Sequence, residues 1–409
     1  MNGFVNTYKS IPLWAKIIAG IILGSIIGFV SPDAAIAIAP LGTLFLNLLK
    51  MLIVPLVMAT LISGICKMGD TKQLTSVGSR IVIYYLITST IAAIIGTIFA
   101  LITQPGRGVT DLLTDEIGES VTYNFIDNVV SWIPTNIVQA MSEANMLQII
   151  VFSLFFGVVL LNLGDKVAPL VKDIDLFADV MLKMTEYVIA FAPYGIMALV
   201  ANMISTMSSA MMQQVVVFIL TDIAACLVMI IIGYPLLLKL FSKLNVMKFM
   251  KKILPCMLVA ASTTSSAATL PVSLKVAKED LGIEEKVCGF TLPLGNTCNM
   301  DGAAIGYACI SVFACNLYGV TITPAVIFQI IFLGLIISIG SAGVKGAGIV
   351  MSTVLMESLG MPLTIIPILS AIWCLIDPGH TTCNNVSDLV GTGIIADRLN
   401  LIKRDIFDK

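Results

Sequence analysis

The amino-acid sequence predicts an all-α membrane protein. Of its 409 residues, 58% are hydrophobic and only 12% are charged, and the mean hydropathy is +1.00. A soluble globular chain carries about a quarter charged residues. Apolar stretches of spanning length also recur along the chain, and lipid offers no water to backbone polar groups, so these stretches must be helices.

Eight apolar segments are long enough to cross a bilayer. They cover residues 13–30, 38–64, 80–103, 146–163, 177–204, 213–239, 287–315 and 361–395. Several exceed the roughly 20 residues that a crossing needs, so we expect tilted or kinked helices. The stretch 104–145 holds six acids but a single basic residue, Arg107, which predicts an exposed loop.

Basic residues follow the second, fourth, sixth and eighth of these segments and also precede the first. All of them lie on one side of the membrane if both termini are cytoplasmic. Cytoplasmic loops carry an excess of lysine and arginine, so we predict this orientation. The acidic loop then lies outside the cell.

Two further segments have apolar arms that are too short to span the membrane alone. One surrounds the polar centre Ser262–Ser266, and the other surrounds the glycine- and serine-rich centre Ser338–Gly348. We predict two re-entrant helical hairpins, at about 253–278 and 322–358, which enter from opposite faces. Such broken segments indicate the binding site of a transporter built from inverted repeats. Two ordinary kinked spans are the alternative.

The last span carries a polar stripe inside the membrane. Asp377, Thr381, Asn384 and Asp388 are spaced four, three and four residues apart, which places them on one helical face. His380 borders this face. Charged side chains within a membrane usually mark a pathway for ions or substrate, although a structural polar seam between helices is the alternative.

Asp301, in the motif NMDG of the seventh span, adds a third carboxylate at membrane depth. Clusters of oxygen ligands suit hard cations, so the sequence favours sodium, or protons carried by the carboxylates, over a transition metal. The nine cysteines show no zinc-ligand spacing, and the single histidine excludes a multi-histidine metal or haem site.

Six motifs, taken together and in order, resemble the glutamate transporter family, the dicarboxylate/amino acid:cation symporters. They are LLKMLIVPLVMATLISGI (48–65), YYLITS (84–89), TTSSAATLPVSLKVAKE (263–279), NMDG (299–302), SIGSAGVKGAG (338–348) and DPGHTTCNNVSDLVGT (377–392). The resemblance implies a transporter rather than an enzyme. It further implies a homotrimer in a prokaryotic cell membrane, an elevator mechanism and no nucleic-acid partner.

The resemblance also implies a division into a static scaffold and a moving transport domain. The scaffold would comprise 1–79 and 104–211, and the transport domain 80–103 and 212–396 with both hairpins. Residues 397–409 would form a cytoplasmic tail.

The resemblance further implies two to three sodium ions. Their ligands, by side chain or backbone oxygen, would be Asp388, Gly295, Asn299 and Asn384 in one site; Thr297, Ser338, Ile339 and Ser341 in a second; and Asp301, Tyr85, Thr88, Ser89 and Asn299 in a third. The implied substrate pocket comprises Ser265, Ser266, Ala303, Val344, Gly348, Asp377, His380, Thr381 and Asn384. Asp377 would hold the α-amino group of the substrate, and Asn384 its α-carboxylate.

This sequence departs from the pattern of glutamate and aspartate carriers at the position that holds the substrate side chain. Those carriers have an arginine where this chain has His380, and imidazole cannot pair a carboxylate in the bidentate manner of guanidinium. Thr264, Ala303 and Lys345 are further departures. We therefore expect a neutral, small or polar amino acid such as serine, threonine or alanine. Acidic substrates bound by a protonated His380 are the alternative, as is a histidine that only fills space.

Two other classes of protein fit less well. An intramembrane serine hydrolase would pair Ser265 or Ser266 with His380, but the sequence contains no G-x-S-x-G elbow. A channel is the second, and concentrative uptake of an amino acid would separate it from a symporter.

Overall fold

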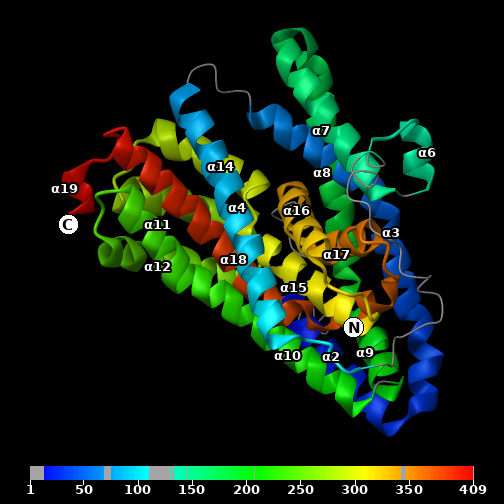
Figure 1. Ribbon diagram of the computed structural model, residues 1–409. Helices are drawn as coiled ribbons and strands as arrows, with labels where there is room; N and C mark the ends of the chain where they lie inside the picture. The colour runs from blue at the N-terminus through cyan, green and yellow to red at the C-terminus, as the bar shows by residue number, and fades with distance from the viewer. Residues whose placement is uncertain are drawn as a thin grey trace, which may run out of the picture.

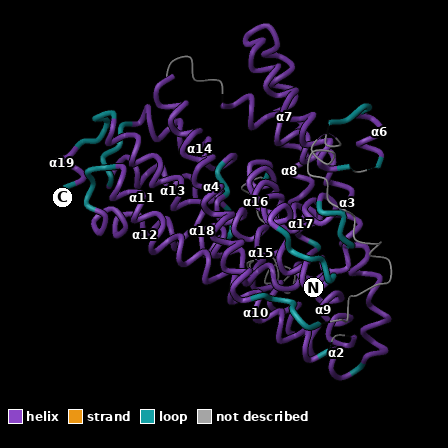
Figure 2. The backbone as a smooth tube through the Cα atoms, viewed as in Figure 1, coloured by secondary structure: helices purple, strands orange, loops and turns teal. Residues whose placement is uncertain are grey.

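The computed structural model describes residues 13–68, 75–109, 130, 133–143, 145–206, 208–341 and 347–408. In this part of the chain the regular structure is helical, and the only β-contact is an isolated bridge between Ile283 and Ile402 (Figure 2). Five helical stretches are long and apolar enough to cross a membrane: Val77–Thr103, Val151–Val188, Ser209–Phe241, Glu285–Leu317 and Leu363–Arg398. The all-α membrane class predicted from the sequence is therefore confirmed.

One group of helices lies on the right-hand side of Figure 1, and its members pack chiefly against one another. The group comprises α2 (Leu13–Val30), α3 (Pro32–Met68), α7 (Met146–Leu163), α8 (Ala168–Ala190) and α9 (Ala192–Thr206). A short 3-10 turn, Gly164–Val167, joins α7 to α8. The segment around α7 and α8 is mostly exposed and apolar, which suits contact with lipid or with another protein surface.

Helix α2 approaches α9 at backbone distance. Three glycines spaced four residues apart, Gly20, Gly24 and Gly28, face the carbonyl oxygens of Pro193, Met197 and Ala201. A side-chain carbon on any of the three would collide with α9. Small residues at this spacing let membrane helices pack closely without a hydrophobic driving force.

A second group of helices packs around α18 and α15. It comprises α4 (Thr75–Thr103), α10 (Ser209–Val228), α11 (Tyr234–Phe241), α12 (Val246–Thr263), α13 (Ser266–Lys275), α14 (Glu285–Cys298), α15 (Asp301–Leu317), α16 (Pro324–Gly340), α17 (Ala347–Ser358) and α18 (Ile366–Arg398). Single π-helical turns at Met229–Gly233 and Val276–Asp280 extend α10 and α13, a 3-10 turn at Leu363–Ile365 precedes α18, and α19 (Arg404–Phe407) ends the chain. The α14–α15 stretch is the most deeply buried of the five spanning stretches.

Three helical stretches in this second group are each broken into two helices. Helix α12 ends at Thr264, whose left-handed φ of 50° turns the chain, and α13 begins after Ser265, whose hydroxyl caps it. Helices α14 and α15 are separated by Asn299 and Met300, and α16 and α17 by residues 341–346. Helices α12 and α13 pack against each other, as do α16 and α17. The turn at Thr264 lies in the polar centre predicted for the first hairpin, and residues 342–346 of the second lie outside the described residues. The two re-entrant hairpins and their entry from opposite membrane faces stay predictions.

Most predicted spans coincide with helices, and two expectations need correction. The span expected at 177–204 is two helices that meet at Phe191, because Pro193 begins a new helix. The stretch 104–145, expected as loop, contains helix α6 (Ile137–Ser142), which Asn136 caps by accepting hydrogen bonds from the backbone of Val138 and Gln139. The acids from Asp111 to Asp127 lie outside the described residues.

Candidate substrate and cation site

A small cavity lies where the broken helices meet α18. It is lined by Thr264, Ser266, Met300, Ala303, Tyr307, Ser341, Gly348, Trp373, Asp377, His380, Thr381 and Asn384. Seven of the nine expected substrate residues are in this set. Ser265 instead caps α13, where its hydroxyl accepts a hydrogen bond from the backbone of Ala268, and Val344 lies outside the described residues.

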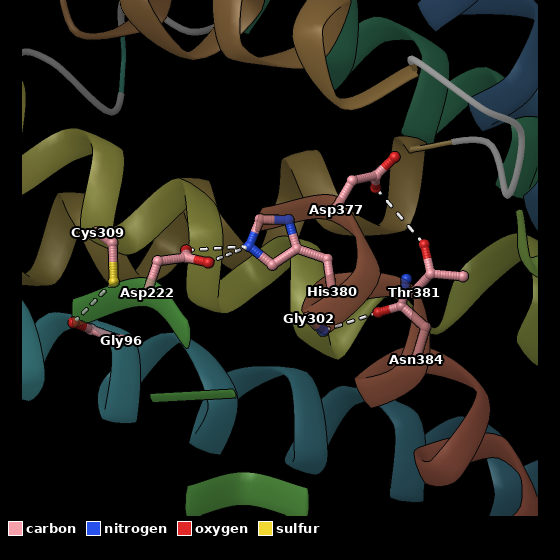
Figure 3. Close-up of polar contacts among 8 residues, drawn as sticks. All are labelled: Gly96, Asp222, Gly302, Cys309, Asp377, His380, Thr381 and Asn384. Atoms are coloured by element: carbon pink, nitrogen blue, oxygen red, sulfur yellow. Dashed lines mark hydrogen bonds and ion pairs between the residues drawn. The ribbon is translucent and has the colours of Figure 1, made fainter. Parts of the chain in front are cut away.

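Helix α18 presents its polar side chains to this cavity (Figure 3). The hydroxyl of Thr381 donates to a carboxylate oxygen of Asp377 at 3.5 Å. One turn further, the amide oxygen of Asn384 accepts a hydrogen bond from the backbone nitrogen of Gly302 at 2.7 Å. This bond joins α18 to the first turn of α15, just beyond the break in the seventh span.

The tip of the first hairpin reaches the same place. The hydroxyl of Ser266 accepts a hydrogen bond from Asn385 at 3.2 Å, which ties the start of α13 to α18. Across the cavity, Gly348 at the start of α17 lies against the ring of Trp373, where a side chain would collide with the indole. The starts of α13 and α17 therefore both contribute to the wall of the cavity that contains Asp377 and Thr381.

His380 is paired with a residue that the sequence analysis did not single out. Both carboxylate oxygens of Asp222, on α10, lie 2.9 Å from its Nε2 atom. The two side chains are 3% and 0% exposed. The signal that could have revealed Asp222 is simply its charge, since an ionisable residue inside a predicted span calls for a partner.

Asp301 lies fully buried among hydroxyl groups. It accepts hydrogen bonds from Ser89 at 2.7 Å, Tyr234 at 2.9 Å and Ser387 at 2.6 Å. Ser89 was predicted here, whereas Tyr234 and Ser387 were not. Tyr85, also predicted, donates its hydroxyl proton to the backbone oxygen of Thr291 at 2.8 Å.

Asp388 lies near Asp301 and shares its network. The side-chain nitrogen of Asn299 donates to Asp388 at 2.8 Å and to Ser387 at 3.0 Å, and Ser387 in turn donates to Asp301. Gly295 borders the Asp388 carboxylate so closely that a side chain there would displace it. The structure thus brings together Gly295, Asn299, Asp301 and Asp388, which the sequence predicted as ion ligands.

The remaining predicted ligands fall into two places. Thr88 and Thr297 donate their hydroxyl protons to carbonyl oxygens of their own helices, at 3.0 and 2.8 Å. Ser338 and Ile339 lie in the last turn of α16, and Ser341 follows it, 2.6 Å from the hydroxyl of Tyr307. Ser338, Ile339 and Ser341 therefore lie at the end of α16, and Ser341 also lines the cavity.

The chemistry of the Asp301–Asp388 network suits a hard cation. Among the described residues neither carboxylate has a basic partner, although one is 0% and the other 4% exposed. The side-chain oxygen of Asn299 is a buried acceptor with no hydrogen-bond partner in the part of the chain described. Buried charge requires a counter-charge, and a sodium ion coordinated by oxygen would supply it and also satisfy Asn299.

A mixed group of possible metal ligands surrounds the imidazole. Asp222, Cys226 and His380 have ligand atoms within 4.8 Å of one another. However, the carboxylate and imidazole are at hydrogen-bond distance, 2.9 Å, whereas two tetrahedral zinc ligands lie roughly 3.3 Å apart. Asp222 and His380 therefore form a hydrogen-bonded pair, and the thiol of Cys226 lies next to it.

Comparison with known proteins identifies similar membrane transporters. The sodium:dicarboxylate symporter family matches residues 13–398. A proton/sodium-glutamate symport protein of Geobacillus stearothermophilus is 28% identical over 400 residues, which cover 95% of this chain and 94% of that protein. A C4-dicarboxylate transport protein of Bacillus subtilis (strain 168) is 29% identical, covering 94% and 93% of the two chains. The neutral amino acid transporter B(0) of Oryctolagus cuniculus is 28% identical, covering 93% and 78%.

Proposed function

The chain belongs to the sodium:dicarboxylate symporter family, and from this premise we propose that it uses a sodium gradient to accumulate an amino acid in the cell. That it is a cation-coupled symporter of the membrane, and not an enzyme, follows from the family. The pair of buried carboxylates, Asp301 and Asp388, supports sodium as the coupling ion because neither has a basic partner among the described residues.

The side chains of the site have separate roles in this proposal. Asp301 and Asp388, with Asn299 and nearby carbonyl oxygens, hold sodium. Asp377 pairs the α-amino group of the substrate, and Asn384 with the two hairpin tips binds its α-carboxylate. Two to three ions per cycle are proposed, because the oxygen ligands surround two buried carboxylates of one network and the last turn of α16.

Sodium binding orders the substrate pocket in this scheme. Asn384 lies between the two sites, since its side chain bonds to the backbone of Gly302, next to Asp301. An ion that neutralises Asp301 would fix the first turn of α15 and therefore the Asn384 side chain. Occupation of the ion site thus favours the substrate-binding arrangement, which is the coupling that symport requires.

We propose a neutral substrate, small or polar, such as serine, threonine or alanine. The observation that supports it is the Asp222–His380 pair: any positive charge on the imidazole is already matched by a buried carboxylate. Among the described residues of the cavity wall there is no lysine or arginine. A side-chain carboxylate would therefore enter a pocket that already contains the carboxylate of Asp377 and whose imidazole is already paired with Asp222.

Acidic amino acids or dicarboxylates are the second candidate. The two bacterial relatives are named for glutamate and for C4-dicarboxylates, and the rabbit relative is named for neutral amino acids. In this case a protonated His380 would bind the side-chain carboxylate through Nδ1, which has no hydrogen-bond partner among the described residues.

One experiment separates the two candidates. Purified protein in proteoliposomes receives an inward sodium gradient, and radiolabelled serine, threonine, alanine, aspartate, glutamate and succinate are offered in turn. The proposal expects sodium-dependent accumulation of the neutral amino acids. Accumulation of aspartate, glutamate or succinate alone would establish the second candidate, and a lack of any accumulation would reject symport.

The two groups of helices support a proposed mechanism of movement. We propose that α2, α3, α7, α8 and α9 form the scaffold of a homotrimer, and that the group around α15 and α18 carries the site across the membrane as an elevator. Both termini would be cytoplasmic, with the second hairpin as the outer gate. The limited packing between the groups, compared with that inside each, supports this division.

A further inference from the structure

The partner of His380 is a carboxylate that the proposed transport cycle does not use. Asp222 lies on α10, is 0% exposed, and forms its only described ion pair with His380. Burial of a carboxylate at this depth costs free energy, and such residues usually have a function. The function of this pair concerns the adjoining cavity, because His380 lines it.

Asp222 determines which nitrogen of the imidazole carries a proton. An ionised carboxylate only accepts hydrogen bonds, and both of its oxygens lie 2.9 Å from Nε2. Nε2 must therefore donate. In neutral imidazole the other nitrogen, Nδ1, is then an acceptor with its lone pair free.

The ring is also held in place by its surroundings. A side-chain carbon at Gly306 would lie 2.5 Å from the Cε1 atom and 2.7 Å from Nε2, so α15 runs directly alongside the imidazole. On another side, the ring of Trp373 makes an edge contact with a centroid distance of 5.7 Å. The imidazole therefore cannot turn over without losing Asp222 or colliding with its neighbours.

The second nitrogen has no partner among the described residues, although it is buried. Figure 3 shows it on the side of the ring that faces Asp377, away from Asp222. Asp377 and His380 both line the cavity. A buried acceptor at the wall of a binding cavity favours a ligand that brings a hydrogen-bond donor to it.

We propose that Asp222 determines substrate specificity: by holding Nε2–H of His380, it turns Nδ1 into a hydrogen-bond acceptor for the substrate side chain. The preferred substrates are then amino acids whose side chain donates a hydrogen bond, with a hydroxyl or carboxamide group. Alanine lacks the donor, and aspartate presents only acceptors. This inference rests on the proposed function and refines its substrate class.

The test is the preference among substrates in wild type and in Asp222→Asn. Asparagine has nearly the same shape but can donate to Nε2, which permits the tautomer with a proton on Nδ1. We expect wild type to take up serine with a KM at least about tenfold below that of alanine, as for a specific buried hydrogen bond. In D222N, Nδ1 can carry the proton and donate, so inhibition by aspartate, which only accepts, should strengthen by about tenfold relative to inhibition by serine, whose hydroxyl can also accept.

Leu220→Val provides the matched control, because Leu220 lies on the same helix as Asp222 but is 62% exposed. Its ratio of aspartate to serine inhibition should equal that of wild type. A substitution that only disturbs the fold would lower uptake of all substrates together, so the ratio reports specificity separately.

Three results would overturn this inference. They are an unchanged ratio of aspartate to serine inhibition in D222N, a wild type that prefers alanine to serine, and a wild type that prefers aspartate. Each still shows sodium-driven accumulation, whereas failure of the proposed function would appear as no accumulation of any amino acid by wild type. Sodium-dependent thermal stabilisation of D222N confirms that the variant is folded.

Discussion

Asp301 illustrates how this protein keeps a carboxylate at membrane depth. Three neutral hydroxyl groups donate to it, and together they stabilise its negative charge without cancelling it. In the proposed ion site, this charge is available to a cation that Asn299 also coordinates. A basic residue in the same place would instead neutralise Asp301 and leave no charge for a cation.

Asp301→Asn should raise the sodium concentration needed for half-maximal effect by at least about tenfold, because a charged ligand is lost. The amide would also face hydroxyl groups oriented to donate. Sodium titration of thermal stability, followed by uptake, measures the shift. Thr90→Ala, on the exposed face of α4, is the control and should match wild type. An unchanged sodium dependence in D301N would remove Asp301 from the ion site.

Gly306→Ala tests the position of the His380 ring. The new methyl group would lie 2.5 Å from the imidazole and must displace it, so the KM for the substrate should rise by about tenfold while the sodium dependence changes little. Gly289→Ala is a suitable control, since nothing lies within 4 Å of the added carbon. Equal KM values in the two variants would show that the ring does not shape the pocket.

At the residue scale, the sequence predicted the acids that share a motif or a helical face. Asp377 and Asp388 were found from their spacing on one helix, and Asp301 from its motif. Asp222 and Tyr234 were missed because their partners lie far along the chain: Asp222 is 158 residues from His380, and Tyr234 is 67 from Asp301. Helical periodicity relates only neighbours, so contacts between helices required the fold.

At the scale of single elements, glycine spacing determines how α2 packs. The carbonyl oxygens of α9 occupy the volume that side chains would otherwise take, so this pair of helices is fixed by backbone contact. Such an interface tolerates no added carbon. It therefore behaves as a rigid unit within the first group of helices.

Gly24→Val should lower the melting temperature of the detergent-purified protein by several degrees, corresponding to about 1–3 kcal/mol of overpacking. Leu23→Val is the control, because the neighbouring Leu23 side chain is 52% exposed, and this variant should melt like wild type. Equal melting temperatures for the two variants would show that α2 and α9 can separate without cost.

Element boundaries were predicted best where the polarity changes abruptly. The expected spans 13–30 and 146–163 coincide with α2 and α7, because polar residues or capping groups flank them. The break at Phe191 was missed, since hydrophobic residues continue on both sides and only Pro193 signals it. The serines predicted a break at Ser262–Ser266, and the turn at Thr264 lies within it, although no glycine marks the left-handed residue.

At the scale of the whole molecule, the two groups of helices meet at the last residue of α16. The hydroxyl of Thr60, on α3, donates to the carbonyl oxygen of Gly340, the last residue of α16, at 3.3 Å. A side-chain carbon at Gly340 would lie 3.0 Å from Leu61. If one group slides along the other during transport, this contact must break.

A cysteine pair at Thr60 and Gly340 should therefore form a disulfide under oxidation and stop uptake by more than about tenfold, because a covalent link forbids sliding. Reduction should restore it. Each single variant and the wild type, oxidised in the same way, serve as controls for the native cysteines. Full uptake by the cross-linked protein would exclude movement between these two groups.

The overall arrangement could be predicted only in part. Composition and positive charge predicted a helical membrane protein and its proposed orientation, and the motifs predicted the family. The packing of α3 against α8 and α9, or of α4 against α15, follows from the shape of side chains on surfaces that look alike in sequence. Hydrophobicity does not discriminate between such surfaces, since lipid and protein interior are equally apolar.

The position of Trp373 has a spectroscopic consequence. The chain contains three tryptophans, and this one lies against both His380 and Gly348, in the cavity wall and beside the second hairpin. Its indole nitrogen is buried with no partner among the described residues. Emission from this side chain should therefore change in wavelength and intensity when a ligand alters the polarity around it. The protein thus carries an intrinsic optical probe at the site, and replacing Trp14 and Trp132 with phenylalanine would isolate its signal for stopped-flow measurements.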